Sequence, residues 1–172
     1  MFAKFEPIVS RPKLLLAAAA LFFLPSADPS NAATATSTFT VQMTVTSSCV
    51  INSAATLNFG STGVLTAAVN GTSTLQVQCT NTTPYNIGLD QGTGTGATFA
   101  ARKMTSGAST ITYSLYSDTG HTTVWGNTVG TNTVAGTGNG ASQSYTVYGQ
   151  VPAQTTPAAA TYTDTITVTV TY

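Results

Sequence analysis

Residues 162–172 read YTDTITVTVTY, and this stretch decides the fold class. Every odd position from 163 to 171 is Thr, while the even positions are mostly apolar. Successive side chains of a β-strand point to opposite faces, and β-branched Thr suits a solvated pleat. The pattern therefore predicts a long amphipathic strand that packs one face on a core. The side chains on that face are Tyr162, Asp164, Ile166, Val168, Val170 and Tyr172.

Apolar residues alternate with Thr, Ser or Gln through the rest of the chain after residue 32, and groups of Gly, Asn and Asp separate these runs. Such residues supply the positive φ angles and Asx turns that reverse a chain. Short strands separated by turns are typical of an immunoglobulin-like β-sandwich, so we expect an all-β domain. The other predicted strands span residues 39–45, 74–79, 85–89, 110–117 and 143–151. The predicted turns lie at residues 70–71, 92–96, 118–120 and 136–140.

The N-terminus has the three parts of a secretory signal peptide. An apolar run over residues 14–24 is followed by small and helix-breaking residues, and it is preceded by Lys4, Arg11 and Lys13. Eleven apolar residues are too few to cross a bilayer as a helix. Residues 30–32 offer the small side chains that signal peptidase accepts. We expect residues 1–32 to be removed by cleavage after Ala32, which leaves an exported chain.

The composition of the remaining chain, about 140 residues, excludes several classes of protein. This length suits a single domain. Its charged side chains give a net charge of about −1 at neutral pH; they are Arg102, Lys103, Asp90, Asp118 and Asp164. Nucleic-acid binding needs several cations that displace counterions, so we expect none here. No stretch after residue 32 is apolar for long enough to span a membrane.

Cys49 and Cys79 are the two cysteines of the chain, and both lie in the exported part. In an oxidising compartment an isolated pair most simply forms a disulfide. The alternatives are a metal site and a nucleophilic cysteine. A metal site would need more ligands than these two thiols and the single His121. By the chain-entropy model, a bridge that closes a loop of this length contributes roughly 3 to 4 kcal/mol.

The chain lacks the motifs of an enzyme or of a cofactor-binding protein. The stretch GTGTG at 92–96 does not complete a phosphate-binding pattern, and no helix is expected after it. His121 lies in a predicted turn, Asp90 is expected to cap a turn, and no GxSxG pattern supplies an activated serine. We therefore predict no catalytic residue, no cofactor and no metal.

Aromatic side chains leave open a different class, a secreted carbohydrate-binding β-sandwich. Packing in the core is the alternative use of these rings. Alternation along 113–117 places Tyr116 on the face opposite to Tyr113, so at least one ring should point outward. The candidate rings are Trp125, Tyr85, Tyr113, Tyr116, Tyr145 and Tyr148.

The chain from Phe39 to Tyr172 resembles the spore coat protein U family, the domain shared by subunits of archaic, Csu-type chaperone-usher pili. The motifs that carry the resemblance are CVI at 49–51, LNFG at 57–60, Cys79, PY at 84–85, IGLDQG at 87–92, RKM at 102–104, YSLYSD at 113–118, WG at 125–126, VYGQVP at 147–152 and the C-terminal YTDTITVTVTY.

The resemblance implies an incomplete immunoglobulin-like β-sandwich that a donor strand from a neighbouring subunit completes. Members of the family look like immunoglobulin folds without their last strand; a periplasmic chaperone lends a strand first, and the next subunit then replaces it. The expected organisation is a donor segment over 33–48 and a pilin domain over 49–172. In this chain the donor side chains would be Phe39, Val41, Met43 and Val45. The acceptor groove and chaperone contact would involve Ile166, Val168, Val170 and Tyr172.

On pattern alone, residues 39–45 could also be an ordinary first strand that pairs within its own sheet. The expected function is that of a structural subunit of a surface fibre or coat, which supports adhesion and biofilm formation. A protective coat built by the same assembly would share the mechanism of a pilus. The expected partners are a periplasmic pilus chaperone, an outer-membrane usher and neighbouring subunits, and the expected route leads through the periplasm to the cell surface.

Overall fold

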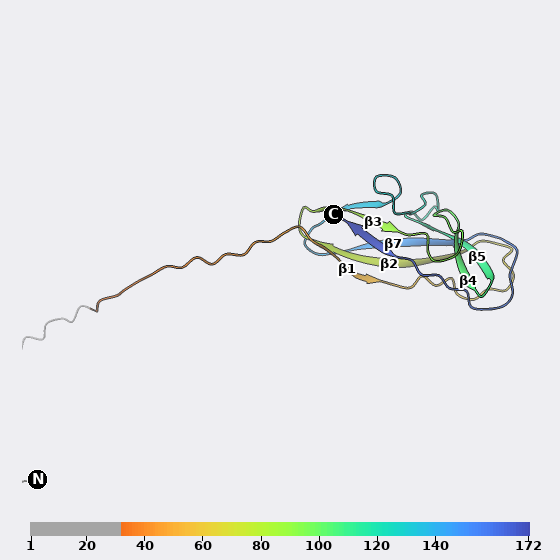
Figure 1. The fold of residues 1–172 in the computed structure, drawn as a ribbon, viewed down its shortest axis with the longest axis horizontal. Helices are drawn as coiled ribbons and strands as arrows, with labels where there is room; N and C mark the ends of the chain where they lie inside the picture. The colour runs from red at the N-terminus through yellow and green to blue at the C-terminus, as the bar shows by residue number, and fades with distance from the viewer. Residues whose placement is uncertain (1–31) are drawn as a thin grey trace, which may run out of the picture. The chain divides into compact units, whose positions relative to one another are not determined.

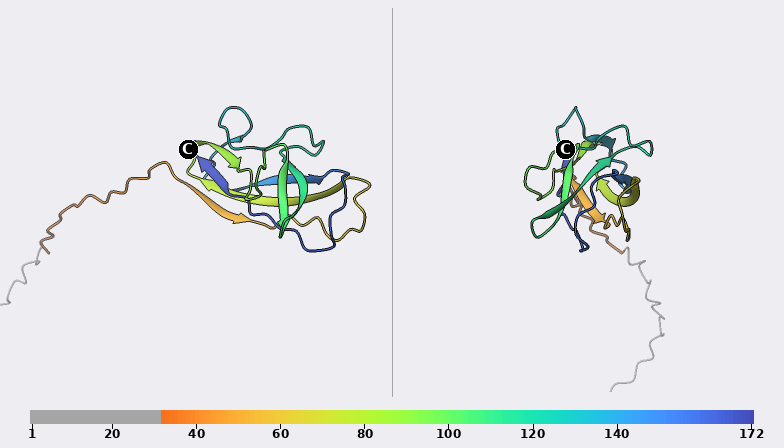
Figure 2. Two further views of the ribbon diagram at one scale, coloured as in Figure 1. Left: turned by 45° about the vertical axis from the view of Figure 1, so that its right-hand side comes forward. Right: turned by 90° about the vertical axis from the view of Figure 1, so that its right-hand side faces the viewer.

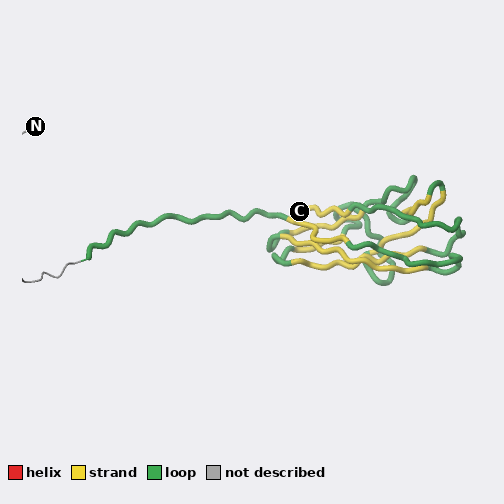
Figure 3. The backbone as a smooth tube through the Cα atoms, turned by 90° about the horizontal axis from the view of Figure 1, so that it is seen from below, coloured by secondary structure: helices red, strands yellow, loops and turns green. Residues whose placement is uncertain are grey.

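The computed structural model describes residues 32–172 (Figure 1). The predicted signal peptide therefore lies outside the described residues, apart from Ala32. Contacts divide the chain into two units, which meet between Gln42 and Met43. Residues 32–42, the described part of the first unit, are exposed and form no strand. In residues 32–172 all regular structure is β-strand, and no helix there could cross a membrane (Figure 3).

Eight strands make up the second unit. They are β1 (Cys49–Ala54), β2 (Val69–Cys79), β3 (Pro84–Leu89), β4 (Arg102–Ser106), β5 (Ser109–Tyr116), β6 (Val134–Thr137), β7 (Ser142–Val151) and β8 (Val168–Thr171).

Two sheets enclose the core, which confirms the predicted all-β, immunoglobulin-like sandwich (Figure 2). The larger sheet has the order β1-β2-β7-β5-β4, and the smaller has the order β6-β3-β8. The longest ladder joins β2 to β7 antiparallel, from Val69 opposite Val151 to Gln78 opposite Ser142. Alternate side chains of both sheets point inward, as the period of a strand requires. The buried apolar residues include Leu75, Val77, Ile87, Leu89, Leu115, Trp125 and Val147.

The prediction of a turn at residues 70–71 is wrong, because Gly71 lies inside β2. Gly71 pairs with Gly149 of β7, and the side chains of Leu57 and Phe59 cover both glycines. An added Cβ at Gly149 would come within 2.8 Å of Leu57 and 2.9 Å of Phe59. These glycines therefore make room for two apolar side chains, and a positive φ is not their role.

The predicted C-terminal strand is shorter than its pattern suggests. β8 spans only Val168–Thr171, and residues 162–167 form no continuous ladder. Thr163 bridges Thr105 of β4, whereas β8 pairs with β3, so the segment passes from the larger sheet to the smaller one. The predicted face is nevertheless confirmed, because the even positions from 162 to 170 are half-buried and the odd ones are exposed.

The other central strands follow the sequence pattern. Predicted strands 74–79, 85–89, 110–117 and 143–151 are confirmed within β2, β3, β5 and β7, although β5 ends at Tyr116. Residues 39–45 form no strand. The prediction missed β1, β4 and β6, which are short or at an edge. Gly136, expected in a turn, belongs to β6 and lies against the Tyr85 and Tyr145 rings.

Candidate functional site

An open hollow of about 460 Å³ lies between two segments that are far apart in the sequence. Residues 54–59, which start at the last residue of β1, form one wall, and residues 161–166 together with Val168 form the other. The core side chains of Leu75, Leu89 and Leu115 are among the residues that line it. A surface recess lined by apolar core residues can accept an apolar partner.

A second hollow of about 550 Å³ continues the first toward the end of the sandwich where Val69 and Val151 lie. Its walls are residues 57–63 and 156–162. The two hollows share Leu57, Phe59, Met104 and Tyr162, so together they form one elongated groove. This groove runs beside most of the segment that leads into β8.

The strands nearest the groove, β1 and β8, are edge strands of different sheets. Within residues 32–172, β1 pairs only with β2, and β8 pairs only with β3. β1 starts beside the end of β2, and β8 ends beside the start of β3. Because a short turn joins the end of β2 to the start of β3, β1 and β8 run in opposite directions (Figure 1). An edge strand presents unused backbone donors and acceptors. An added strand that enters the groove could therefore pair with one of these edges.

The structure brings two of the four predicted groove residues to the groove. Ile166 and Val168 line it. Val170 is half-buried, packs on the core and pairs with Ile87 of β3, but it is not among the lining residues. Tyr172 is 60% exposed and lies beyond the end of β8.

The predicted donor side chains are all exposed to solvent. Phe39 is 87% exposed and Met43 is 86% exposed, which are unusual values for side chains of this size. Val41 and Val45 are similarly exposed. No strand within the described residues pairs with this segment. Four large apolar side chains thus alternate along an extension that has no partner within residues 32–172.

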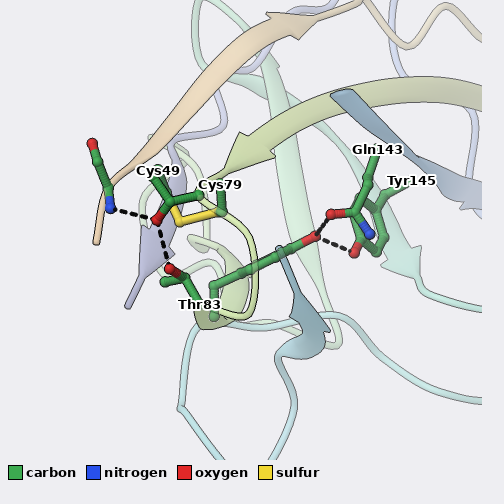
Figure 4. Close-up of a disulfide and its surroundings, with 8 residues drawn as sticks. Cys49, Cys79, Thr83, Gln143 and Tyr145 are labelled. Atoms are coloured by element: carbon green, nitrogen blue, oxygen red, sulfur yellow. Dashed lines mark hydrogen bonds between the residues drawn. A yellow bond between two sulfur atoms is a disulfide. The ribbon is translucent and has the colours of Figure 1, made fainter. Parts of the chain in front are cut away.

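The predicted disulfide is confirmed, and it joins the first residue of β1 to the last residue of β2 (Figure 4). The two Cα atoms lie 4.1 Å apart. The adjoining backbone is also held, because Ser48 N donates to Thr80 Oγ1 over 3.1 Å and Thr80 N donates to Ser48 O over 2.9 Å. The point where the N-terminal extension enters the sandwich is therefore fixed both covalently and by hydrogen bonds.

Asp164 anchors the wall of the groove formed by the segment before β8. Its Oδ2 accepts a hydrogen bond of 2.7 Å from the Tyr113 hydroxyl. Its Oδ1 accepts bonds from the backbone N and the hydroxyl of Thr93, at 2.8 and 2.9 Å, and from Thr165 N at 2.8 Å. The carboxylate thereby ties this wall to β5 and to the loop after β3.

Asp90, which directly follows β3, binds the same segment just before β8. Its Oδ1 accepts hydrogen bonds of 3.0 Å from Gly92 N and from Thr167 N. The bond from Gly92 confirms that Asp90 caps the turn. Burial alone would raise the pKa of Asp90, but the hydrogen bonds from Thr167 and Gly92 and the charge of Arg102 together lower it. Asp90 therefore stays ionised at neutral pH and keeps both bonds charge-assisted.

Arg102 is a structural residue that the sequence did not single out beyond its place in the RKM motif. Its side chain is fully buried. Its guanidinium donates to the backbone oxygens of Trp125 at 2.7 Å, Asp90 at 2.8 Å, Phe99 at 2.9 Å and Leu89 at 3.2 Å. It thus joins β4 to the end of β3 and to the Trp125 segment. An arginine at the start of a short strand carries no local signal for such a role.

Two buried tyrosines, Tyr113 and Tyr85, should make the stability of the domain fall at alkaline pH. Burial raises the pKa of Tyr113 well above its usual value, and the bond to Asp164 raises it further. Burial likewise raises the pKa of Tyr85, and its bond to Tyr145 adds to this. The folded chain thus keeps these protons above pH 10, where the unfolded chain releases them. This contribution to stability is complete below about pH 10 and is lost as the pH rises further.

We expect each tyrosine to lower the free energy of unfolding by about 1.4 kcal/mol per pH unit above pH 10. Urea unfolding between pH 9 and pH 11.5 measures this slope. Tyr113→Phe should remove about half of it, although the substitution also costs stability at neutral pH. Equal slopes for Tyr113→Phe and the unsubstituted chain would contradict the prediction.

Most of the candidate carbohydrate-binding rings do not face solvent. Trp125, Tyr85 and Tyr113 are buried, and Tyr145 bonds to Tyr85 over 2.6 Å (Figure 4). Tyr116 and Tyr148 pair across β5 and β7 on the outer face, where the His121 ring meets both edge to face. His121 therefore packs against two aromatic rings. Within residues 32–172 no cluster of His, Cys, Asp and Glu could hold a metal ion.

Comparisons with known proteins agree with this architecture. The model of the Spore Coat Protein U domain matches residues 35–169. Protein U of Myxococcus xanthus is 36% identical over 159 residues, which cover 84% of this chain and 88% of that protein.

One similar solved structure is the crystal structure of the CsuC-CsuE chaperone-tip adhesion subunit pre-assembly complex from archaic chaperone-usher Csu pili of Acinetobacter baumannii. The match has a TM-score of 0.54 and 25% identity, and it covers 75% of this chain. The chain spans only 40% of that solved chain. Because the family model matches most of its length and Protein U is similar throughout, the chain belongs to the Spore Coat Protein U domain family and has the fold of a pilus or coat subunit.

Proposed function

We propose that this chain is a structural subunit of a cell-surface fibre or coat, and that it polymerises by lending residues 33–48 to the groove of the next copy. The observation that carries the proposal is the elongated apolar groove between residues 54–63 and residues 156–166, which starts at the end of β1 and reaches the start of β8. In the same chain, an exposed segment carries apolar side chains at alternate positions. Addition of such a segment to an open sheet edge is β-augmentation, of which pilin donor-strand complementation is a known example.

The expected energy of the link is sufficient for a fibre without covalent bonds. Burial of Phe39, Val41, Met43 and Val45 would contribute roughly 6 to 12 kcal/mol before ordering costs. Backbone hydrogen bonds to an open edge would add about 1 kcal/mol each. The exposed Thr and Gln at the intervening positions would remain in water, which suits a strand that is buried on one face only.

We further propose that a periplasmic chaperone fills the groove before assembly and that an outer-membrane usher exports the subunit. An open groove with exposed strand edges favours aggregation, so a subunit that carries one needs a temporary partner. The chaperone complex of the similar Csu subunit supports this proposal. Adhesion and biofilm formation would then be properties of the assembled fibre at the cell surface.

Deletion of residues 34–46 tests the proposal. The shortened chain should still bind a chaperone, because its groove is intact, but it should not extend a fibre. Co-purification with the chaperone and electron microscopy of assembled material measure the two properties. Normal fibres from the shortened chain would refute donation by this segment.

A pair of matched variants separates the two faces of the segment. Replacing Phe39, Val41, Met43 and Val45 by Thr removes the apolar face and should abolish fibres. Replacing the intervening Thr38, Thr40 and Thr44 by Ser changes the solvated face and should leave assembly unchanged. Equal assembly by both variants would show that the apolar face is not what the groove binds.

A further inference from the structure

The N-terminal extension enters the sandwich through a short edge strand. β1 is an edge strand, and its residues after Cys49 are exposed. Five residue pairs join it to β2, and a bulge interrupts them between Ile51 and Ser53. If residues 33–48 bind a neighbouring copy, as proposed above, any tension on the fibre reaches each domain at Ser48. An edge strand with so few contacts is a poor place to receive that tension.

Loss of β1 would also change how the rest of the domain is loaded. The chain from Cys49 returns to β2 at Val69, which lies beside Val151 at the opposite end of β2 from Cys79. When the force leaves the domain after Val151, at the end of β7, tension without β1 would act on β2 and β7 from the same end and would separate their paired residues one after another. Tension that enters at Cys79 acts along the ladder instead, so all of its pairs resist together.

We infer that the Cys49–Cys79 disulfide has a mechanical function: it transfers tension from the N-terminal extension directly into β2 and bypasses β1. The bridge sits at the first residue of β1, which is the first position where it can intercept this tension. It delivers the tension to β2, which forms ten residue pairs with β7 and contributes buried Leu75, Val77 and Cys79 to the core. The Ser48–Thr80 hydrogen bonds reinforce the same connection.

Single-molecule pulling on the mature chain tests this inference. One handle is attached at Thr36 in the extension, and the other at the exposed Thr155 after β7. Residues 49–68 would span about 70 Å when extended. Cys49 and Val69 start at opposite ends of β2, about 33 Å apart at the rise of a strand. Without the disulfide we expect an early step of about 35 Å, followed by unfolding at a lower force.

With the disulfide intact we expect neither the early step nor the lower force. Two ways of removing the bridge are compared, because the substituted chain could fold poorly: a Cys49→Ala and Cys79→Ala double variant, and reduction of the folded wild-type chain during the measurement. An early step in the oxidised chain, or its absence in both disulfide-free samples, would overturn the inference.

A second pair of handles separates a mechanical role from general stabilisation. Handles at Thr82 and Thr155 apply tension beyond Cys79, so the path no longer includes β1. With these handles, removal of the bridge should add no early step. If removal changes both pulling geometries in the same way, the disulfide is only a general stabiliser. The measurement uses single chains, so its result does not depend on whether residues 33–48 bind another copy.

Discussion

A copy of residues 36–46 fused after Tyr172 through a short Asn-Gly turn should raise the free energy of unfolding by about 3 kcal/mol or more. β8 ends at Thr171, so a strand that turns back there would run antiparallel to β8 and enter the groove. The four apolar side chains would be buried there, and the backbone would pair with an open edge. Because the copy is part of the same chain, it avoids the entropy cost of association.

Thermal and urea unfolding of the mature chain, with and without the fused copy, measure this gain. For a domain of about 140 residues, 3 kcal/mol corresponds to a rise in Tm of roughly 10 °C. The matched control is a fused copy in which the residues corresponding to Phe39, Val41, Met43 and Val45 are Thr. Equal melting of the two fused chains would contradict the proposed fit between segment and groove. It would instead favour a sandwich that is complete by itself, such as a secreted binding module.

Arg102→Met should lower the free energy of unfolding by about 3 to 5 kcal/mol. The substitution keeps an unbranched apolar stem but leaves four backbone oxygens without their donor, those of Leu89, Asp90, Phe99 and Trp125. Each buried acceptor without a partner costs about 1 to 3 kcal/mol, and relaxation offsets part of this sum. The loss should also weaken the end of β3, which pairs with β8 beside the groove.

The fused chain is a suitable background for this measurement, because its added stability should keep the substituted domain folded. Lys103→Met is the matched control, since Lys103 is the adjacent residue and donates only to Thr95 O at 3.0 Å. Its cost should stay within about 0.5 kcal/mol. Arg102→Lys should fall closer to Met than to Arg, because an ammonium cannot reach four oxygens in fork geometry. A cost below about 1 kcal/mol for Arg102→Met, close to that of an ordinary surface substitution, would contradict the structural role.

Only part of the candidate site could be predicted from the sequence. Alternation identified Phe39 to Val45 as an apolar face, and their exposure is what a segment without a partner requires. Of the residues expected at the acceptor groove, Ile166 and Val168 line the groove, whereas Val170 packs against β3 and Tyr172 is exposed. The opposite wall, formed by residues 54–63, was missed because its residues form no regular pattern.

The sequence by itself determined the all-β class, the central strands, the inward face of residues 162–170 and the Cys49–Cys79 pairing. These properties follow from a side-chain period of two residues and from the presence of two cysteines, both of which are local or compositional. Only the tertiary structure decided that Gly71 and Gly149 make room for Leu57 and Phe59, that Arg102 binds four backbone oxygens, and that residues 54–63 and 156–166 flank an open groove. Each of these depends on which distant segments become neighbours, and no local pattern of residues encodes that choice.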